Sequence, residues 1–235
     1  MSEDRTKGTL TRNNLRDLVL AVSFISVLFC PVSEGTLIVG LLLLAAGSLL
    51  HLVTKGILVR NVVLCHKGVY GIVRHPYYLA NYSIDSSFCL LSGNVYLLLA
   101  YPFLFYWAYG PTMRKEEIYL AAHHGDVFQR HSAAVPQIFP DRTSLSRWRS
   151  PLEGFSLQRI SWKEYARVAR FCSLGIYISI LHEVQEEGLP GLMDIIRPRR
   201  NDYDEFLFGL CAAALYGVSL LFMRWSRSVE TSIDK

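Results

Sequence analysis

The stretch TLIVGLLLLAAGSLLHLV, residues 36–53, contains no Asp, Glu, Lys or Arg. A helix that crosses the ~30 Å hydrocarbon core of a bilayer needs about 20 apolar residues, with about 17 as the lower end. Residues 36–53 therefore predict a membrane-spanning helix. A second apolar run, residues 18–32, precedes it and is separated from it by the short polar turn Ser33, Glu34 and Gly35. The two runs together predict a helical hairpin.

Further apolar runs follow along the chain, and most of them are interrupted by polar or helix-distorting residues. Asp85 and Pro102 lie inside two of these runs, and Arg167 and Arg170 lie in the first turns of a third. Interruptions of this kind are typical of tilted or incomplete spans. We predict an all-α fold, a polytopic transmembrane bundle of about six spans, at residues 18–32, 36–53, 78–91, 95–109, 165–181 and 206–225.

The overall composition agrees with a membrane protein that also has substantial polar segments. Of 235 residues, 51% are hydrophobic and 19% are charged, and the formal net charge is +4. A charge this modest argues against nucleic-acid binding on electrostatic grounds. The cysteines are far apart and form no C-x-x-C pair, which argues against a disulfide framework and a structural zinc site. We expect reduced, mostly buried thiols at Cys30, Cys65, Cys89, Cys172 and Cys211.

The basic residues predict how the spans are oriented. Lys and Arg accumulate in the cytoplasmic loops of membrane proteins. With six spans, 21 of the 24 basic residues fall on one face, and the other three, Arg197, Arg199 and Arg200, lie in the long loop on the opposite face. We therefore place both termini and the motif-bearing loops in the cytosol, and we favour a bacterial inner membrane over the endoplasmic reticulum.

This topology divides the chain into five parts. The long cytosolic segment after the fourth span separates a core region from a C-terminal pair of spans. We predict a cytosolic N-terminal segment at 1–17, a transmembrane hairpin at 18–53, a core with two further spans at 54–140, a cytosolic linker at 141–163, and a pair of spans at 164–235. Three roles stay open for the last part: a lipid-facing portal, contact in a homo-oligomer, and binding of a partner.

Two polar segments with unusual composition face the cytosol in this arrangement. The first is CHKGVYGIVRHPYYLANY, residues 65–82, and the second is RKEEIYLAAHHGDVFQRHSAAVPQIFP, residues 114–140. Only the hairpin at residues 78–109 separates them. Because that hairpin returns to the face on which it began, we expect the two segments to lie close together.

The two segments carry a two-part motif. The first part reads G-x-Y-x-x-x-R-H-P-x-Y, and the second reads E-E-x-x-L-x-x-x-x-G followed by V-P-x-x-x-P. The matching positions are Gly68, Tyr70, Arg74, His75, Pro76 and Tyr78, then Glu116, Glu117, Leu120, Gly125, Val135, Pro136 and Pro140. Over residues 36–140 the chain resembles the isoprenylcysteine carboxyl methyltransferase and phospholipid methyltransferase superfamily. Those proteins are integral membrane enzymes that use S-adenosylmethionine.

The resemblance implies a cytosol-facing cofactor pocket formed by loops and a short helix, with a lipid-like or small-molecule acceptor entering from the bilayer. Catalytic roles would fall to Arg74, Glu116 and Glu117. Cofactor contacts would come from the same three residues and from Gly68, Tyr70, His75, Pro76 and Tyr78. The resemblance assigns no metal.

The chemistry of these residue types suits that cofactor. S-adenosylmethionine presents a carboxylate, an ammonium, ribose hydroxyls, an aromatic base and a sulfonium. Arg74 can clamp a carboxylate through two N–H donors, and aromatic faces such as that of Tyr78 attract a sulfonium. Glu116 and Glu117 suit the ammonium or the ribose. Because adjacent helical residues point ~100° apart, we expect only one of the two carboxylates to face the site.

The methyl acceptor stays open among a lipid amine, a carboxylate and a thiol. Arg74 would orient a carboxylate or thiolate, and one of Glu116 and Glu117 would take the proton of an amine. The sequence lacks two tyrosines that the family has near the acceptor and carries Phe128 and His131 there. We take those two, with Asn81 and Asp85, as substrate candidates. Asp85 has an equal alternative as a packing residue that is hydrogen-bonded to Asn81 or Ser86.

Other interpretations remain for the same residues. Arg74 and His75 would serve equally as interfacial anchors if they stood alone. His123, His124 and His131 are weak metal-ligand candidates, because Gly125 interrupts the helix between them. An NADPH-dependent sterol-type reductase and a non-enzymatic membrane protein that retains the fold are the alternative functions.

Overall fold

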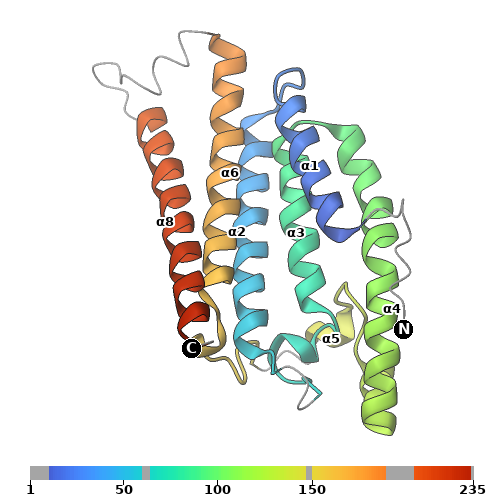
Figure 1. Cartoon of the computed structure of the whole chain (residues 1–235). Coiled ribbons are helices and arrows are strands. Elements are labelled where there is room, and N and C mark those ends of the chain that lie inside the picture. Colours follow the sequence, from blue (N-terminus) through green and yellow to red (C-terminus); the bar gives the residue numbers. More distant parts are fainter. Residues whose placement is uncertain (1–10, 60–63, 147–149, 189–203, 234–235) are drawn as a thin grey trace, which may run out of the picture.

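The computed structural model describes residues 11–59, 64–146, 150–188 and 204–233, and over these it confirms an all-α fold without strands (Figure 1). Two single-turn 3₁₀ helices, η1 (Gly68–Gly71) and η2 (Leu157–Arg159), lie in the connections. The described residues contain the α-helices α1 (Arg12–Ser26), α2 (Glu34–Ile57), α3 (Pro76–Leu91), α4 (Val95–Ala134), α5 (Arg142–Ser146), α6 (Trp162–Glu187) and α8 (Asp204–Ile233).

Each of the predicted spans overlaps an α-helix, although α1 ends at Ser26 and so covers only part of the run at 18–32. The structure does not confirm six membrane crossings. Two of the described helices are long and apolar enough to cross a bilayer, namely α2 and the Phe206–Ser228 part of α8. α1 and α3 have 15 and 16 residues, which is short for a crossing. Tyr, Trp and Pro lower the hydropathy of α4, and basic residues lower that of α6.

Residues with local capping chemistry begin the helices. The side chain of Ser33 accepts a hydrogen bond from the Thr36 N–H at the start of α2, and Asn94 does the same for Leu97 in α4. Pro76 occupies the first turn of α3, where its missing N–H costs nothing, and His75 precedes it in a non-helical conformation. The RHP motif therefore marks a helix start, as the sequence indicates.

The helices do not pair in the order that the sequence suggests. α1 packs on α3 and α4, whereas α2 packs on α3 and α6, so the expected hairpin of the first two runs is not a packed pair. Glycines permit the close approach of α2 and α3. A Cβ at Gly40 would lie 2.8 Å from Leu91, and one at Gly47 would lie 3.0 Å from Ile84. Side-chain volume, which span hydropathy does not report, therefore selects α3 as the partner of α2.

The direction of the helices brings the two motif segments to one end of the bundle. α2 and α4 run toward the lower end of Figure 1, where α3 and α6 begin. There the Arg74 N–H donates to Pro136 O at 2.8 Å, and the His75 N–H donates to Gln137 O at 2.9 Å. These backbone bonds join the segment at 65–82 to the one at 114–140.

α4 extends well beyond its apolar half and then turns back. Its 40 residues include Gly125, whose φ of 47° and ψ of −125° interrupt the helix. The Arg74 guanidinium bonds both to Glu117 and to the carbonyl of Ser132. In a straight helix these two residues would be ~22 Å apart, so the chain after Gly125 must return toward α3.

The cysteines are free thiols. Cys89 is buried and Cys211 is exposed, while the other three are half-buried. The expectation of mostly buried thiols is therefore wrong for Cys211. Arg197, Arg199 and Arg200, on which part of the orientation argument rests, lie outside the described residues.

Candidate functional site

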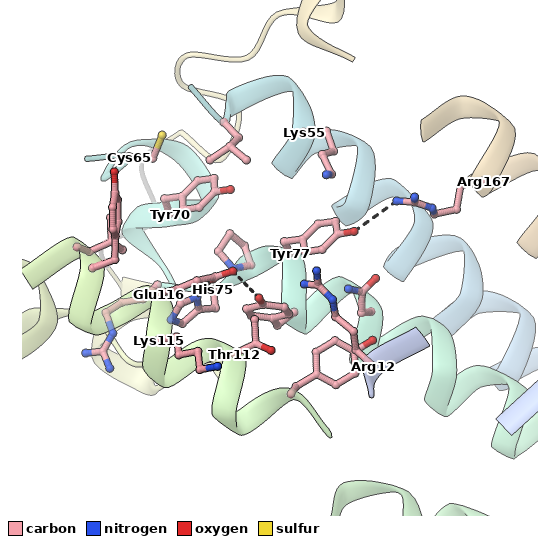
Figure 2. Close-up of a pocket in the computed structure, with 18 of the residues that line it drawn as sticks. Arg12, Lys55, Cys65, Tyr70, His75, Tyr77, Thr112, Lys115, Glu116 and Arg167 are labelled. Carbon is pink, nitrogen blue, oxygen red and sulfur yellow. Dashed lines mark hydrogen bonds and ion pairs between the residues drawn. The ribbon is translucent and has the colours of Figure 1, made fainter. Parts of the chain in front are cut away.

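A cavity of about 1310 Å³ opens at the end of the bundle where the motif segments meet, with walls from α1, α2, α3, α4 and α6 (Figure 2). Both segments contribute side chains to it. Of the site residues predicted from the sequence, the cavity is lined by Tyr70, Arg74, His75, Pro76, Tyr78, Asn81, Glu116, Phe128 and His131.

Three predicted residues do not line this cavity. Gly68 has a φ of +58°, and a Cβ there would lie 2.7 Å from the carbonyl oxygen of Pro151. Its role is to let the loops pack, because only glycine fits both the conformation and the space. Asp85 is buried beneath the cavity floor, and Glu117 faces a second hollow on the other side of α4.

The two adjacent carboxylates of α4 have separate surroundings. Glu116 lines the cavity, is about half exposed, and accepts a hydrogen bond from the Tyr78 hydroxyl at 2.7 Å. Glu117 forms an ion pair with Arg74, with Nη2 and Oε1 2.9 Å apart. The expected ~100° difference in direction thus makes Glu116 the carboxylate available to a ligand.

Arg74 acts mainly within the protein. Besides its bonds to Glu117, its Nη1 donates to Ser132 O at 2.6 Å and to Val135 O at 3.2 Å. These contacts occupy most of the five N–H donors of the guanidinium. The interpretation of Arg74 as a free carboxylate clamp therefore does not fit this geometry. Arg74 instead fastens the returning end of α4 to the start of α3.

His75 connects the two carboxylates. Its Nε2 lies 3.2 Å from Glu117 Oε1, and its Nδ1 lies 3.7 Å from Glu116 Oε2. Burial lowers the pKa of His75 more than the neighbouring carboxylates raise it. The ring is therefore neutral at pH 7, and it is within hydrogen-bond distance of Glu117 but not of Glu116.

Glu117 stays ionised despite its surroundings. Burial alone would raise its pKa, but a hydrogen bond from the Gln137 side chain and the charge of Arg74 lower the pKa overall. Gln137 thus contributes a neutral donor to the carboxylate.

The opposite wall contains a charged cluster that sequence reasoning missed. Glu164 of α6 accepts from His51 Nε2 at 2.8 Å, from Lys55 Nζ at 3.0 Å and from Arg167 Nη1 at 2.7 Å. Lys55 also lies over the ring of Tyr77, 4.3 Å from its centroid. His51 and Lys55 are one turn apart on α2, and Glu164 and Arg167 are one turn apart on α6, but His51 and Glu164 are 113 positions apart and no local pattern connects the two helices.

Asp85 is part of a buried ion pair. The Arg16 Nε donates to its carboxylate at 2.8 Å, and the Tyr101 hydroxyl donates to it at 2.9 Å. Asn81 accepts from the same guanidinium at 3.1 Å. The structure therefore favours the packing interpretation of Asp85, with Arg16 as a partner that the sequence did not suggest. Arg16 itself lines the cavity.

The cavity wall is strongly cationic. Eight Lys and Arg residues line it, against Asp17 and Glu116 as the acids. Four of these cations form ion pairs with Asp85, Glu117 or Glu164. Within the described residues, Arg12, Lys115 and Arg170 form no ion pair. A negatively charged ligand group would therefore be stabilised here.

Aromatic rings and one open donor complete the wall. Tyr77 and Tyr78 meet edge to face, with ring centroids 5.9 Å apart, and Tyr109 packs against Tyr78 at 5.5 Å. The Nε2 atom of His131 is buried and has no hydrogen-bond partner in the described part of the chain. It is available to a ligand. No group of three or more His, Cys, Asp or Glu side chains among the described residues is arranged to hold a metal ion.

Comparison of the chain with protein-family models, with curated proteins and with solved structures finds no match. The resemblance seen in the two-part motif therefore stays a prediction.

Proposed function

We propose that the protein is an integral membrane methyltransferase that uses S-adenosylmethionine and acts on a lipophilic or small-molecule acceptor at the cytosolic membrane face. One observation carries this proposal. Two segments that are far apart in the sequence contribute a hydrogen-bonded carboxylate, tyrosine rings and cations to a single cavity.

The residues present fit the groups of this cofactor. The Glu116 carboxylate, oriented by Tyr78, suits the ribose hydroxyls or the ammonium. Lys115 offers a cationic donor to the carboxylate. The faces of Tyr77 and Tyr78 suit the adenine and the sulfonium. When bound, the cofactor supplies an electrophilic methyl group.

The size of the cavity supports a reaction between two bound molecules. Sites for one small molecule usually measure ~300–1000 Å³. A cavity of about 1310 Å³ exceeds that range and leaves room for an acceptor beside the cofactor. Holding both reactants in near-attack geometry, with water excluded, is the main source of rate acceleration in such a transfer.

The residues around the cavity indicate how an acceptor would be activated. The Glu116 carboxylate lines the cavity, so it can form a hydrogen bond with an amine bound there and would accept the proton of that amine. The neutral His75 ring lies between Glu116 and Glu117, and its contact with Glu117 holds it beside the base. A carboxylate acceptor would need no base and would be oriented by the unpaired cations instead.

The membrane part of the proposal rests on two helices and on the outer surface. α2 and the Phe206–Ser228 part of α8 have the length and composition of spans. Large apolar side chains are exposed around the bundle, for example Leu42, Phe103 and Leu221, each at least 64% exposed. Apolar side chains in such numbers on the outside of a bundle are typical of contact with lipid. We propose a multi-pass protein with both termini cytosolic.

Calorimetric titration of the detergent-purified protein with S-adenosylmethionine and S-adenosylhomocysteine tests the cofactor assignment. Removal of one charge-assisted hydrogen bond in Glu116→Gln is expected to weaken binding at least about tenfold. Glu34→Gln, at the opposite end of α2, is the matched control and should bind like the wild type. Failure of the wild type to bind either compound would refute the proposal.

An NADPH-dependent reductase is the second candidate, because the unpaired cations of the cavity also suit the phosphates of that cofactor. NADPH belongs in the same titration. Selective binding of NADPH, weakened in Lys115→Gln, would replace the methyltransferase assignment. Binding of neither cofactor would favour a non-enzymatic protein.

A further inference from the structure

One wall of the cavity changes from basic to apolar along two helices. On α1, Arg12, Arg16 and Leu20 line the cavity at intervals of one turn. On α6, Arg167 and Arg170 are followed by Phe171 and Leu174. Both helices run upward in Figure 1, so on each helix the cations come first and the apolar side chains follow toward the upper end.

The basic residues of the two helices line one cavity. The Arg16 guanidinium is 4.8 Å from the centroid of the Phe171 ring, so side chains of α1 and α6 meet inside it. Arg12 and Arg167 lie one turn, ~6 Å, before these residues on parallel helices. The cations of α1 and α6 therefore surround one region, and Figure 2 shows Arg12 and Arg167 around the same space.

The charge in this region is only partly neutralised. Arg167 is paired with Glu164 and donates to the Tyr77 hydroxyl. Arg12 and Arg170 form no ion pair within the described residues. Because cations repel one another at close range, the arrangement is most stable with an anion between them.

The backbones of α1 and α6 are not packed against each other. α1 packs chiefly on α3 and α4, and α6 packs chiefly on α2 and α8, so side chains rather than helix backbones meet between α1 and α6. Leu20 and Leu174 are half-buried there. An alkyl chain inserted between these helices would replace exposed apolar surface with contact.

We infer that α1 and α6 form a site for an anionic amphiphile with a phosphate head and an alkyl tail. The phosphate lies among Arg12, Arg167 and Arg170, and the tail runs along Leu20, Phe171 and Leu174. A doubly charged phosphate matches several guanidinium groups better than a single carboxylate does, because each guanidinium offers paired N–H donors. The site is formed by α1 and α6 and does not depend on which cofactor binds beside α3 and α4.

Thermal unfolding in dodecyl maltoside micelles, with added dodecyl phosphate, tests this site. The lipid analogue is expected to raise the unfolding midpoint of the wild type, because a ligand that binds the folded state stabilises it. In the double variant Arg12→Gln, Arg170→Gln, the concentration for a half-maximal rise should increase at least about tenfold. Neither arginine forms a described ion pair, so the variant should fold. Arg224→Gln, an exposed arginine of α8 outside the cavity, is the control.

Three further additions separate the contributions of head and tail. Dodecylphosphocholine has the same tail with a zwitterionic head and should not raise the midpoint. Octyl phosphate should need at least about tenfold more ligand than dodecyl phosphate, because it buries four fewer methylenes. A rise of equal size with inorganic phosphate would show a plain anion site, and an unchanged response of the double variant would show that the lipid binds elsewhere. Either result would overturn the inference. The cofactor titration can succeed or fail independently of it.

Discussion

Arg74 joins three parts of the chain, and a variant can distinguish that role from ligand binding. Its guanidinium bonds to Glu117 and to the carbonyls of Ser132 and Val135. Arg74→Ala removes the cation that is paired with the half-buried Glu117 carboxylate and the donor of two carbonyls, which is expected to cost about 2–4 kcal/mol of unfolding free energy. Arg74→Lys keeps the charge without the paired geometry and should lie in between. Calorimetric unfolding measures both. An unchanged midpoint in Arg74→Ala, with cofactor binding lost, would contradict the structural role.

The ionisable groups at this end of the bundle make the folded protein more stable as the pH rises. Although burial opposes the shift, the bond to His51 and the neighbouring cations lower the pKa of Glu164 from 4.5 to about 2. The pKa of Glu117 is also lowered, and burial lowers the pKa of His75 and His131. The unfolded chain therefore binds more protons than the folded one at acidic pH, so stability increases with pH.

The unfolding midpoint should accordingly fall in two steps on acidification. The histidines contribute the first loss below about pH 6.5, and the carboxylates contribute the second below about pH 4.5. A pH series of thermal unfolding curves between pH 8 and pH 3 checks this. Glu164→Gln should flatten the second step. A midpoint that rises between pH 7 and pH 4 would show that the sign is wrong.

The reversal of α4 depends on one glycine. Gly125 adopts a φ of 47° and a ψ of −125°, and no atom lies within 4 Å of the position that a Cβ would take. The cost of Gly125→Ala is therefore backbone strain without a clash, expected at about 1–3 kcal/mol. The strain should also loosen the contact of Arg74 with Ser132. Calorimetric unfolding of the purified variant measures it.

Gly110 provides the matched control in the same helix. It lies in the helical part of α4, has no positive φ, and likewise has open space around a built Cβ. Gly110→Ala should be neutral or stabilise the protein by ~0.5–1 kcal/mol, because alanine loses less entropy in a helix. Equal destabilisation by both substitutions would show that the kink does not need glycine.

The alternation of helix directions predicts the topology of the whole molecule. Glu153 lies in the connection before α6, and Glu34 lies at the start of α2, at opposite ends of the bundle in Figure 1. Both side chains are exposed. In a cysteine-free background placed in sealed vesicles, a membrane-impermeant thiol reagent should label Glu153→Cys and Glu34→Cys from opposite sides. Equal labelling of both from one side, with intact vesicles, would contradict a spanning bundle.

The apolar runs of the chain predicted where the long helices lie but not all of their bounds, since α1 is Arg12–Ser26 and α4 continues to Ala134. A run such as residues 36–53 favours a helix because a helix satisfies every backbone hydrogen bond within the segment itself. The sequence also predicted the start of α3, because Pro76 fits the first turn of a helix and disfavours helical geometry at His75. The convergence of the two polar segments followed from the return of the intervening hairpin.

Tertiary packing alone decided which charges pair and which line the cavity. Arg16 meets Asp85 across 69 positions because α1 packs on α3. Glu164 binds Lys55 of α2 and Arg167 of its own helix because α6 packs on α2. Tertiary packing also gave the two adjacent carboxylates different surroundings, since Glu116 faces the cavity and Glu117 binds Arg74. The physical reason is that hydropathy and capping act within a few residues of the chain, whereas ion pairing and cavity shape depend on which helix surfaces fit together.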